Sequence, residues 1–308
     1  MTHVSGDVSV IKALMANRGN GSSGIFRFLL LITGGGSAGT QSAGMTSELH
    51  KLGMGHLFKW VVGISSGGAS GAALVSGQPE VAEQYYRGPV QSSRYVHPFR
   101  FWRLLNLDWV ANALRRILNV QAVLASPQEL YLAATTIDGK QVLLNGKTAT
   151  PDLVSAIRAS AGVCGGGTKV NGRMYWDGVF SDPLPIESLV KQFDPTHILV
   201  LMNQRKSKLE GPHRWLDDYL CAGFVGQSGS LTLMKGALHA RVRMLQAVKK
   251  IEAGETGGVP VAILWPSRIP VSPLGAPEGW MEKASAWSAR RLRQIFCRNG
   301  ANTLQPVA

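Results

Sequence analysis

The amino-acid sequence predicts an α/β fold built on a mostly parallel sheet, and two observations lead to this prediction. Residues 25–33 and 197–202 are short, nearly continuous apolar runs, which is typical of strands buried on both faces of a parallel sheet. Strand and helix patterns also alternate from residue 25 to residue 75. The chain has 308 residues, 45% hydrophobic and 17% charged, which excludes a disordered chain and a charged coiled coil.

The first elements can be placed in order along the chain. Residues 1–24 end in a run rich in Gly, Ser and Asn, which predicts a flexible lead-in. The strand at 25–33 is followed by a glycine-rich segment, residues 34–39, and then by a helical stretch. A second strand at 60–64 leads into residues 65–75, whose small side chains predict a helix.

The middle of the chain alternates helices with short strands. Residues 99–118 are amphipathic and rich in Trp and Arg, which predicts a helix. Residues 130–137 and 141–144 flank an Asp-Gly pair, a sequence typical of a β-hairpin turn. A helix with Pro in its first turn is expected over 151–161, and a short strand over 174–176.

The C-terminal part adds helices and one strand. We expect a helical stretch over 212–251, a strand at 259–264 and a basic helix over 280–297. The sequence contains no internal repeat and no long linker. We therefore expect one domain over residues 25–308, with a motif-bearing core at about 25–205 and an extension over 206–308.

The charge of the chain predicts an anionic partner. Thirty-two Lys and Arg against 19 Asp and Glu leave a net charge of +13, which attracts nucleic acid, acidic lipid or an acidic protein. The basic residues are dispersed and form no recognised nucleic-acid motif, so no nucleic-acid partner is expected.

Cysteine usage and hydropathy bear on the compartment. The three cysteines, Cys164, Cys221 and Cys297, form no CxxC pair, which fits a reducing compartment and predicts no zinc site. The first 25 residues do not resemble a signal peptide, and the longest apolar runs are far shorter than a membrane span. These features predict a cytoplasmic protein with, at most, peripheral membrane contact.

The glycine-rich segment, residues 34–39, matches the GxGxxG pattern of dinucleotide-binding loops. Such a site needs an acidic residue about 20 positions later, at the end of the second strand. No Asp or Glu occurs between Glu48 and Glu80, and the second strand ends at Ile64. Dinucleotide binding is therefore disfavoured, and no cofactor is expected.

Residues 63–67 match the GxSxG pattern of a nucleophile elbow, with Ser65 at its centre. In such an elbow a Cβ at the flanking positions would collide with the strand or helix, and the following helix N-terminus favours negative charge beside the nucleophile. Residues 35–39 match the same pattern. The pattern at Ser65 is therefore also consistent with a plain tight turn between strand and helix.

The two glycine-containing loops indicate a functional site more strongly together than either does alone. Each follows a parallel strand, so both are expected at the same edge of the sheet, where glycine amides suit an oxyanion hole. A serine there needs a base. His197, His213 and His239 are available for a Ser-His-Asp triad, and Asp177 ends a strand in an Asp-Gly turn.

These residues together resemble the patatin-like phospholipase family. The resemblance rests on blocks at 34–39, 63–68 and 177–179, supported by Ala-Ile-Arg-Ala-Ser-Ala at 156–161 and Asp-Pro-Leu-Pro-Ile at 182–186. The match covers roughly residues 25–205. It implies a three-layer α/β/α fold with a mostly parallel central sheet.

The resemblance also implies a function and a set of site residues. The expected protein is a lipid acyl ester hydrolase of the phospholipase A or lysophospholipase type, which acts through an acyl-serine intermediate without metal or cofactor. Ser65 would be the nucleophile, Asp177 the base, and Gly34, Gly35 and Gly36 the oxyanion hole. The expected substrate is a phospholipid or another fatty acyl ester.

Two departures from the family pattern bear on activity. Ala38 stands where the loop usually carries Arg or Lys, and the usual proline after the Ser-Ala helix is replaced near Val163 and Cys164. Altered substrate preference or weakened catalysis could follow. The alternatives are a catalytically silent lipid-binding relative and an ordinary Ser-His-Asp esterase.

The helix expected at 99–118 suggests where a membrane could bind. Its apolar side chains include Phe101, Leu104, Leu105 and Trp109, and Arg100, Arg103, Arg115 and Arg116 are candidates for contacts with phosphates. Trp and Arg on an amphipathic helix suit an anionic bilayer, so this segment is a candidate lid or docking surface. The other interpretation is a core-packing helix with solvated arginines.

Overall fold

The computed structural model describes residues 4–19, 25–96, 104–148, 152–163, 166–211, 228–266 and 268–301. Within them, nine strands form a sheet in the order β1-β9-β8-β2-β3-β4-β7-β6, with β5 paired to β4. The strands are β1 (Val4–Gly6), β2 (Phe28–Ile32), β3 (Phe58–Ile64), β4 (Glu129–Thr135), β5 (Gln141–Asn145), β6 (Thr168–Val170), β7 (Arg173–Asp177), β8 (His197–Leu201) and β9 (Val261–Leu264).

The centre of the sheet is parallel and its edges are antiparallel. Strands β9, β8, β2, β3 and β4 run in one direction, whereas β1, β5 and β7 pair with them antiparallel, and β6 pairs antiparallel with β7. In the register of β2 and β3, Ile32 pairs with Gly63, so the two strands end side by side. The loops that follow them therefore begin at the same edge of the sheet.

The central strands are buried on both faces, as the continuous apolar runs predicted. Leu29 and Leu31 of β2 belong to one hydrophobic core, and Leu30 and Ile32 belong to the other. Because side chains alternate along a strand, only a strand covered on both sides uses every residue in this way.

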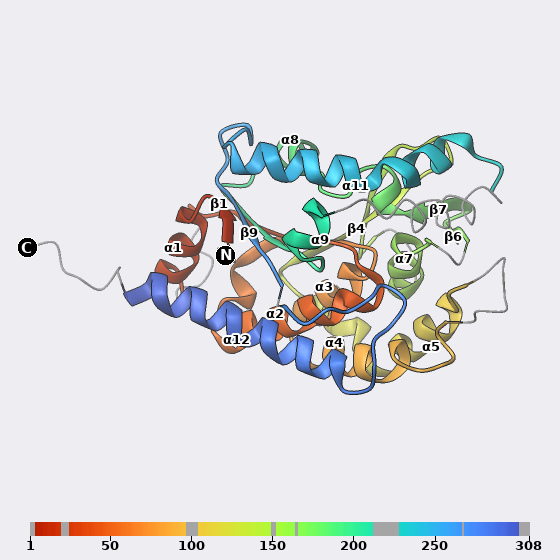
Figure 1. The fold of residues 1–308 in the computed structure, drawn as a ribbon, viewed down its shortest axis with the longest axis horizontal. Coiled ribbons are helices and arrows are strands. Elements are labelled where there is room, and N and C mark those ends of the chain that lie inside the picture. Colours follow the sequence, from red (N-terminus) through yellow and green to blue (C-terminus); the bar gives the residue numbers. More distant parts are fainter. Residues whose placement is uncertain are drawn as a thin grey trace, which may run out of the picture.

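Helices cover both faces of the sheet and complete three layers (Figure 1). One core is shared with α1 (Ser9–Ala16), α2 (Thr40–Lys51), α3 (Gly67–Val75), α4 (Pro79–Tyr85), α5 (Leu107–Ile117), α6 (Val120–Ala125), α7 (Leu153–Ser160) and α12 (Trp280–Ala301). The other is shared with α8 (Ile186–Phe193), α9 (Lys206–Glu210) and α11 (Leu231–Glu252). Four short turns of helix are η1 (Gly36–Gly39), η2 (Gly55–Leu57), η3 (Tyr86–Val90) and η4 (Gly178–Phe180). The predicted fold class is confirmed.

The flexible lead-in predicted for residues 1–24 is wrong over most of its described part. Strand β1 adds to the edge of the sheet beside β9, and α1 follows it. Val10, Ile11 and Leu14 of α1 are completely buried. Their spacing puts them on one side of the helix, and burying them offsets the entropy lost on ordering the segment.

Two predicted helices have different boundaries. Helix α5 begins at Leu107, where the Asn106 side chain accepts a hydrogen bond from the Trp109 amide and caps the helix. Residues 97–103, which include Phe101, Arg100 and Arg103, lie outside the described residues. The stretch predicted at 212–251 is helical from Leu231 onward, and residues 212–227 also lie outside the described part.

The other predicted elements agree with the structure within a few residues. Strands β4 and β5 form the predicted hairpin, and Gly139 in its turn has a φ of 81°. Helix α7 is capped by the Asp152 carboxylate, which accepts from the Val154 amide. Among the helices of the described residues, none combines the length and hydrophobicity needed to cross a bilayer.

Candidate active site

The elbow after β3 presents Ser65 in a conformation that only a local constraint can hold. The φ of Ser65 is 54°, a region that non-glycine residues rarely occupy. The Ser65 amide donates to Ser160 Oγ at 3.0 Å, and Ser160 Oγ donates to the Ala133 carbonyl at 2.5 Å. The elbow is thereby attached to α7 and β4.

The glycines of the elbow are required by close backbone contacts. A Cβ on Gly63 would lie 2.5 Å from the Gly68 Cα, and one on Gly67 would lie 2.2 Å from the Ile32 carbonyl oxygen. Both distances are shorter than any tolerable contact, so the sequence interpretation of these positions agrees with the structure.

The first glycine loop lies against the elbow. A Cβ on Gly34 would come within 2.9 Å of the Ser65 Cβ, so this position brings a bare backbone next to the hydroxyl. Gly36 has a φ of 57° and lines the same cavity as Ser65. Within the described residues, the amides of Gly34, Gly35 and Gly36 donate no hydrogen bond. They remain available for an anionic oxygen.

Asp177 approaches Ser65 from the other side, at the end of β7. It is completely buried, and its Oδ1 accepts from the Val179 amide at 2.9 Å. Burial raises the pKa of Asp177 to about 7, although the Val179 amide and the Ser65 hydroxyl lower it. Oδ2 has no well-formed hydrogen bond among the described residues, so the contact with Ser65 is loose. Catalytic hydrogen bonds are often long without substrate.

A largely apolar cavity of about 230 Å³ opens at Ser65. Most of its wall is formed by apolar and tyrosine side chains from α4, η3, α5, α7 and the segment before α5, and Ser272, Pro273 and Leu274 also line it. Such a lining suits an extended hydrocarbon group rather than a polar metabolite.

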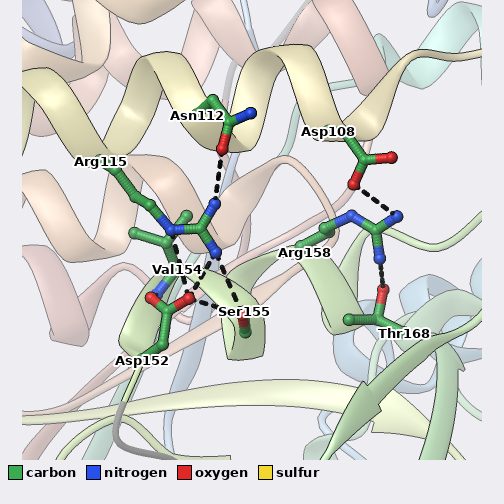
Figure 2. Close-up of polar contacts among 8 residues, drawn as sticks. All are labelled: Asp108, Asn112, Arg115, Asp152, Val154, Ser155, Arg158 and Thr168. Carbon is green, nitrogen blue, oxygen red and sulfur yellow. Dashed lines mark hydrogen bonds and ion pairs between the residues drawn. The ribbon is translucent and has the colours of Figure 1, made fainter.

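Ion pairs connect α5 to α7 along this wall (Figure 2). Arg115 binds Asp152, which caps α7, and also donates to Asn112 and Ser155. Arg158 binds Asp108 at 2.9 Å and donates to Thr168. Arg115, interpreted from the sequence as a candidate for contacts with lipid phosphates, is therefore already paired with a carboxylate.

The described histidines lie away from Ser65. His197 begins β8, at the opposite end of that strand from the glycine loops, and packs against Phe26 and Phe28. His239 is exposed on α11 and contacts the Lys235 carbonyl. Neither of them, nor His50 or His56, lines the cavity. His213 lies outside the described residues. No group of three potential metal ligands occurs in the part of the chain that the structure describes.

The family model described as "Patatin-like phospholipase" matches residues 30–190, just over half of the chain. The chain belongs to the patatin-like phospholipase family. All three glycine- and aspartate-containing blocks lie inside the matched region. The resemblance stated from the sequence is thereby confirmed.

Two known proteins are similar to this patatin-like chain, one in sequence and one in fold. It is 26% identical over 207 residues to "Uncharacterized protein YjjU" of Escherichia coli (strain K12), covering 62% of this chain and 58% of that protein. The chain thus spans less than two thirds of this relative. VipD from Legionella pneumophila has a similar fold, with a TM-score of 0.52 and 11% identity over 89% of this chain and 67% of that one.

Sequence reasoning missed Asn203, which holds the glycine loop of the patatin-like site. Its buried side chain donates to the Thr33 carbonyl at 2.6 Å and accepts from the Ser42 amide, in the first turn of α2, at 2.9 Å. A Cβ on Gly35 would lie 2.8 Å from the Asn203 Cβ. No local pattern marks Asn203, because its role depends on β8 lying beside β2.

We expect Asn203→Ala to lower the free energy of unfolding by about 2–4 kcal/mol, because two buried backbone groups lose their partner. Chemical denaturation of the variant and the parent protein measures this difference. Asn112→Ala, at an exposed position of α5 where the side chain, among the described residues, accepts only from Arg115, is the matched control and should cost less than about 1 kcal/mol. Equal losses of unfolding free energy in both variants would show that Asn203 does not hold the glycine loop.

Ala38, which stands where the family loop usually has Arg or Lys, occupies a buried position. It lies within η1, is 3% exposed and packs in the hydrophobic core. An Arg or Lys at this buried position would have to displace neighbouring side chains or reach solvent, because a buried charge without a partner is costly.

Proposed function

We propose that this chain is a lipid acyl ester hydrolase of the phospholipase A or lysophospholipase type. The observation that carries the proposal is a juxtaposition around Ser65. This elbow serine lines an apolar cavity, the buried carboxyl of Asp177, whose pKa is raised to about 7, lies beside its hydroxyl, and the loop of three glycines with unused amides lies against it. Membership of the patatin-like phospholipase family supports the same reading.

The first half of the reaction forms an acyl-serine. Ser65 Oγ attacks the carbonyl carbon of the ester as its proton passes to Asp177, and the carbonyl oxygen becomes an oxyanion bound by amides of the Gly34–36 loop. The tetrahedral intermediate then collapses: the bond to the leaving alcohol breaks, and Asp177 returns the proton to that alcohol. The acyl chain occupies the apolar cavity.

The second half releases the fatty acid. Water attacks the acyl-serine carbonyl as Asp177 accepts its proton, and the same amides bind the second oxyanion. Breakage of the bond to Ser65 Oγ restores the hydroxyl when the proton returns from Asp177. A carboxyl with a pKa near 7 can both accept and return a proton at neutral pH, which favours Asp177 for this task.

An ordinary Ser-His-Asp esterase is the weaker alternative, since none of the described histidines lines the cavity at Ser65. A catalytically silent lipid-binding relative would keep the cavity and lose turnover. Labelling with a serine-reactive fluorophosphonate separates these possibilities from the dyad.

The expected result is a covalent adduct on Ser65, mapped by peptide mass spectrometry, that is absent in Asp177→Asn. An adduct on Ser37 would put the nucleophile in the other GxSxG segment and overturn the proposal. Labelling that survives Asp177→Asn and disappears on replacing a histidine would favour the triad. Absence of any adduct in folded protein would favour the silent relative.

A further inference from the structure

A second surface cavity, of about 550 Å³, lies outside the Ser65 site. It is formed by α12 and by the connection that precedes this helix. We call its lining the α12 surface, and it consists of Arg268, Ile269, Pro270, Trp280, Lys283, Trp287 and Arg291. The α12 surface contains three cations, two tryptophans and no carboxylate, and nothing in the proposed reaction uses it.

The α12 surface follows from the spacing of the helix. Trp280, Lys283, Trp287 and Arg291 recur at intervals of three and four residues, which puts them on one side of α12. Buried side chains such as Phe296 anchor the helix to the core. Trp287 is nevertheless 54% exposed and Trp280 37% exposed, although large aromatic side chains normally stabilise a protein by being buried. Two exposed rings on one helix side indicate a contact surface.

The cations of the α12 surface are unneutralised, in contrast to those beside the Ser65 cavity. Among the described residues, no carboxylate forms an ion pair with Arg268, Lys283 or Arg291. Glu282, the acidic neighbour of Lys283, is directed to Arg87 at 3.7 Å. The α12 surface therefore keeps its positive charge for an external anion.

The α12 surface and the wall of the Ser65 cavity share one segment of the chain. The connection between β9 and α12 contributes Arg268, Ile269 and Pro270 to the α12 surface, and a few residues later it contributes Pro273 and Leu274 to the cavity at Ser65. Leu274 is itself 46% exposed. Helix α12 lies on the opposite side of the sheet from α11 (Figure 1). A flat anionic layer touching the α12 surface would thus contact the segment whose next residues, Pro273 and Leu274, line the Ser65 cavity.

We propose that the α12 surface docks the protein onto an anionic lipid bilayer. The inference rests on the proposed lipid substrate, and it moves the membrane contact from the α5 region to α12. Tryptophan rings prefer the interface between head groups and acyl chains, and Lys and Arg are attracted to anionic head groups at the same depth. The charge complements such a surface, and the position presents the Ser65 cavity to lipids in it.

The test measures vesicle binding separately from hydrolysis. The full chain carrying Ser65→Ala, so that no lipid is consumed, is sedimented with vesicles of phosphatidylcholine alone or mixed with phosphatidylglycerol. We expect Lys283→Gln with Arg291→Gln to lower the partition coefficient on the mixed vesicles about 30-fold, because each cation near an anionic surface contributes about a fivefold preference. Trp280→Ala with Trp287→Ala should weaken binding to both kinds of vesicle.

The matched control is Lys235→Gln with Lys249→Gln. These lysines are exposed on α11, across the sheet, and the change in net charge is the same. The control substitutions should lower the partition coefficient on the mixed vesicles by less than about threefold, because these charges lie away from the docked face and are screened by salt. Equal losses in both double variants would overturn the proposal, and so would equal binding of the parent protein to both kinds of vesicle.

Two further measurements distinguish membrane docking from the proposed hydrolase activity and from dimerisation. The Lys283 and Arg291 double variant, in a chain with intact Ser65, should hydrolyse soluble p-nitrophenyl butyrate at the parent rate. If the parent hydrolyses no ester, the proposed function fails while vesicle binding still tests the α12 surface. A dimer that the double variant dissociates, with unchanged vesicle binding, would assign the surface to a second copy of the chain and overturn membrane docking.

Discussion

Replacing Ser65 with alanine is expected to lower kcat/KM for a fatty acyl ester by at least about 10⁴-fold, whereas Ser37→Ala should retain activity within about threefold. Loss of the nucleophile leaves only the oxyanion amides and binding to act on the ester. The two serines are the centres of the two GxSxG patterns in the chain, residues 35–39 and 63–67. They therefore form a matched pair.

The structure gives the two serines different surroundings. Ser65 lines the apolar cavity with a φ of 54°, whereas Ser37 is completely buried in η1 and its amide donates to the Pro273 carbonyl. Hydrolysis of p-nitrophenyl butyrate and of a lysophospholipid measures both variants, and circular dichroism checks that each is folded. Full activity in Ser65→Ala would refute the proposed nucleophile.

Asp177→Asn is expected to remove activity and yet stabilise the protein at high pH. The amide can keep the contact with the Val179 amide but cannot accept a proton, so kcat/KM should fall by about 10³-fold or more. In the parent enzyme, kcat/KM should fall about tenfold per pH unit below about pH 7, because only the ionised Asp177 accepts the serine proton.

The effect on stability has the opposite direction. Burial raises the pKa of Asp177 in the folded protein to about 7, from an ordinary value of 3.8 in the unfolded chain. The folded state therefore binds more protons than the unfolded state between about pH 4 and pH 7, and ionising this carboxyl costs stability as the pH rises through that range. The asparagine variant does not have this cost.

Thermal unfolding across pH measures the effect. At pH 8 we expect Asp177→Asn to raise Tm by about 3 °C or more, and at pH 4 to leave it nearly unchanged. Asp138→Asn is the control: this exposed carboxyl binds Lys140, which lowers the pKa of Asp138 to about 2. It should give no stabilisation at pH 8 and no loss of activity. A lower Tm for Asp177→Asn at pH 8 would contradict the assigned cause.

Much of the fold could be predicted because its signals are local. The buried strand β2 is an uninterrupted apolar run, the β4–β5 hairpin has an Asp-Gly turn, and α7 follows an Asp cap. Helix α1 was missed, since its three buried side chains are too few to distinguish it from a flexible segment until β9 provides an edge for β1.

The residues of the candidate site also divide into those that the sequence reveals and those that only the structure reveals. Ser65 and the glycines around it are recognisable in sequence because an elbow needs small residues within four positions. Asp177 was noted at the end of a strand, its role as a base came from the resemblance, and the structure brings it next to Ser65. Asn203 escaped detection, and Ser160 was noted only as part of a supporting motif, because each acts on a loop more than 90 residues away in the chain.

The sequence alone determined the fold class, the family and the residues proposed for chemistry, because each depends on spacing along a short segment. Only the tertiary structure decided which charges are neutralised. Arg115 and Arg158 have carboxylate partners on neighbouring helices, whereas Lys283 and Arg291 have none among the described residues. An ion pair depends on which elements pack together, and side chains from α5, α7 and the connection before α12 meet at one cavity only after the sheet has formed.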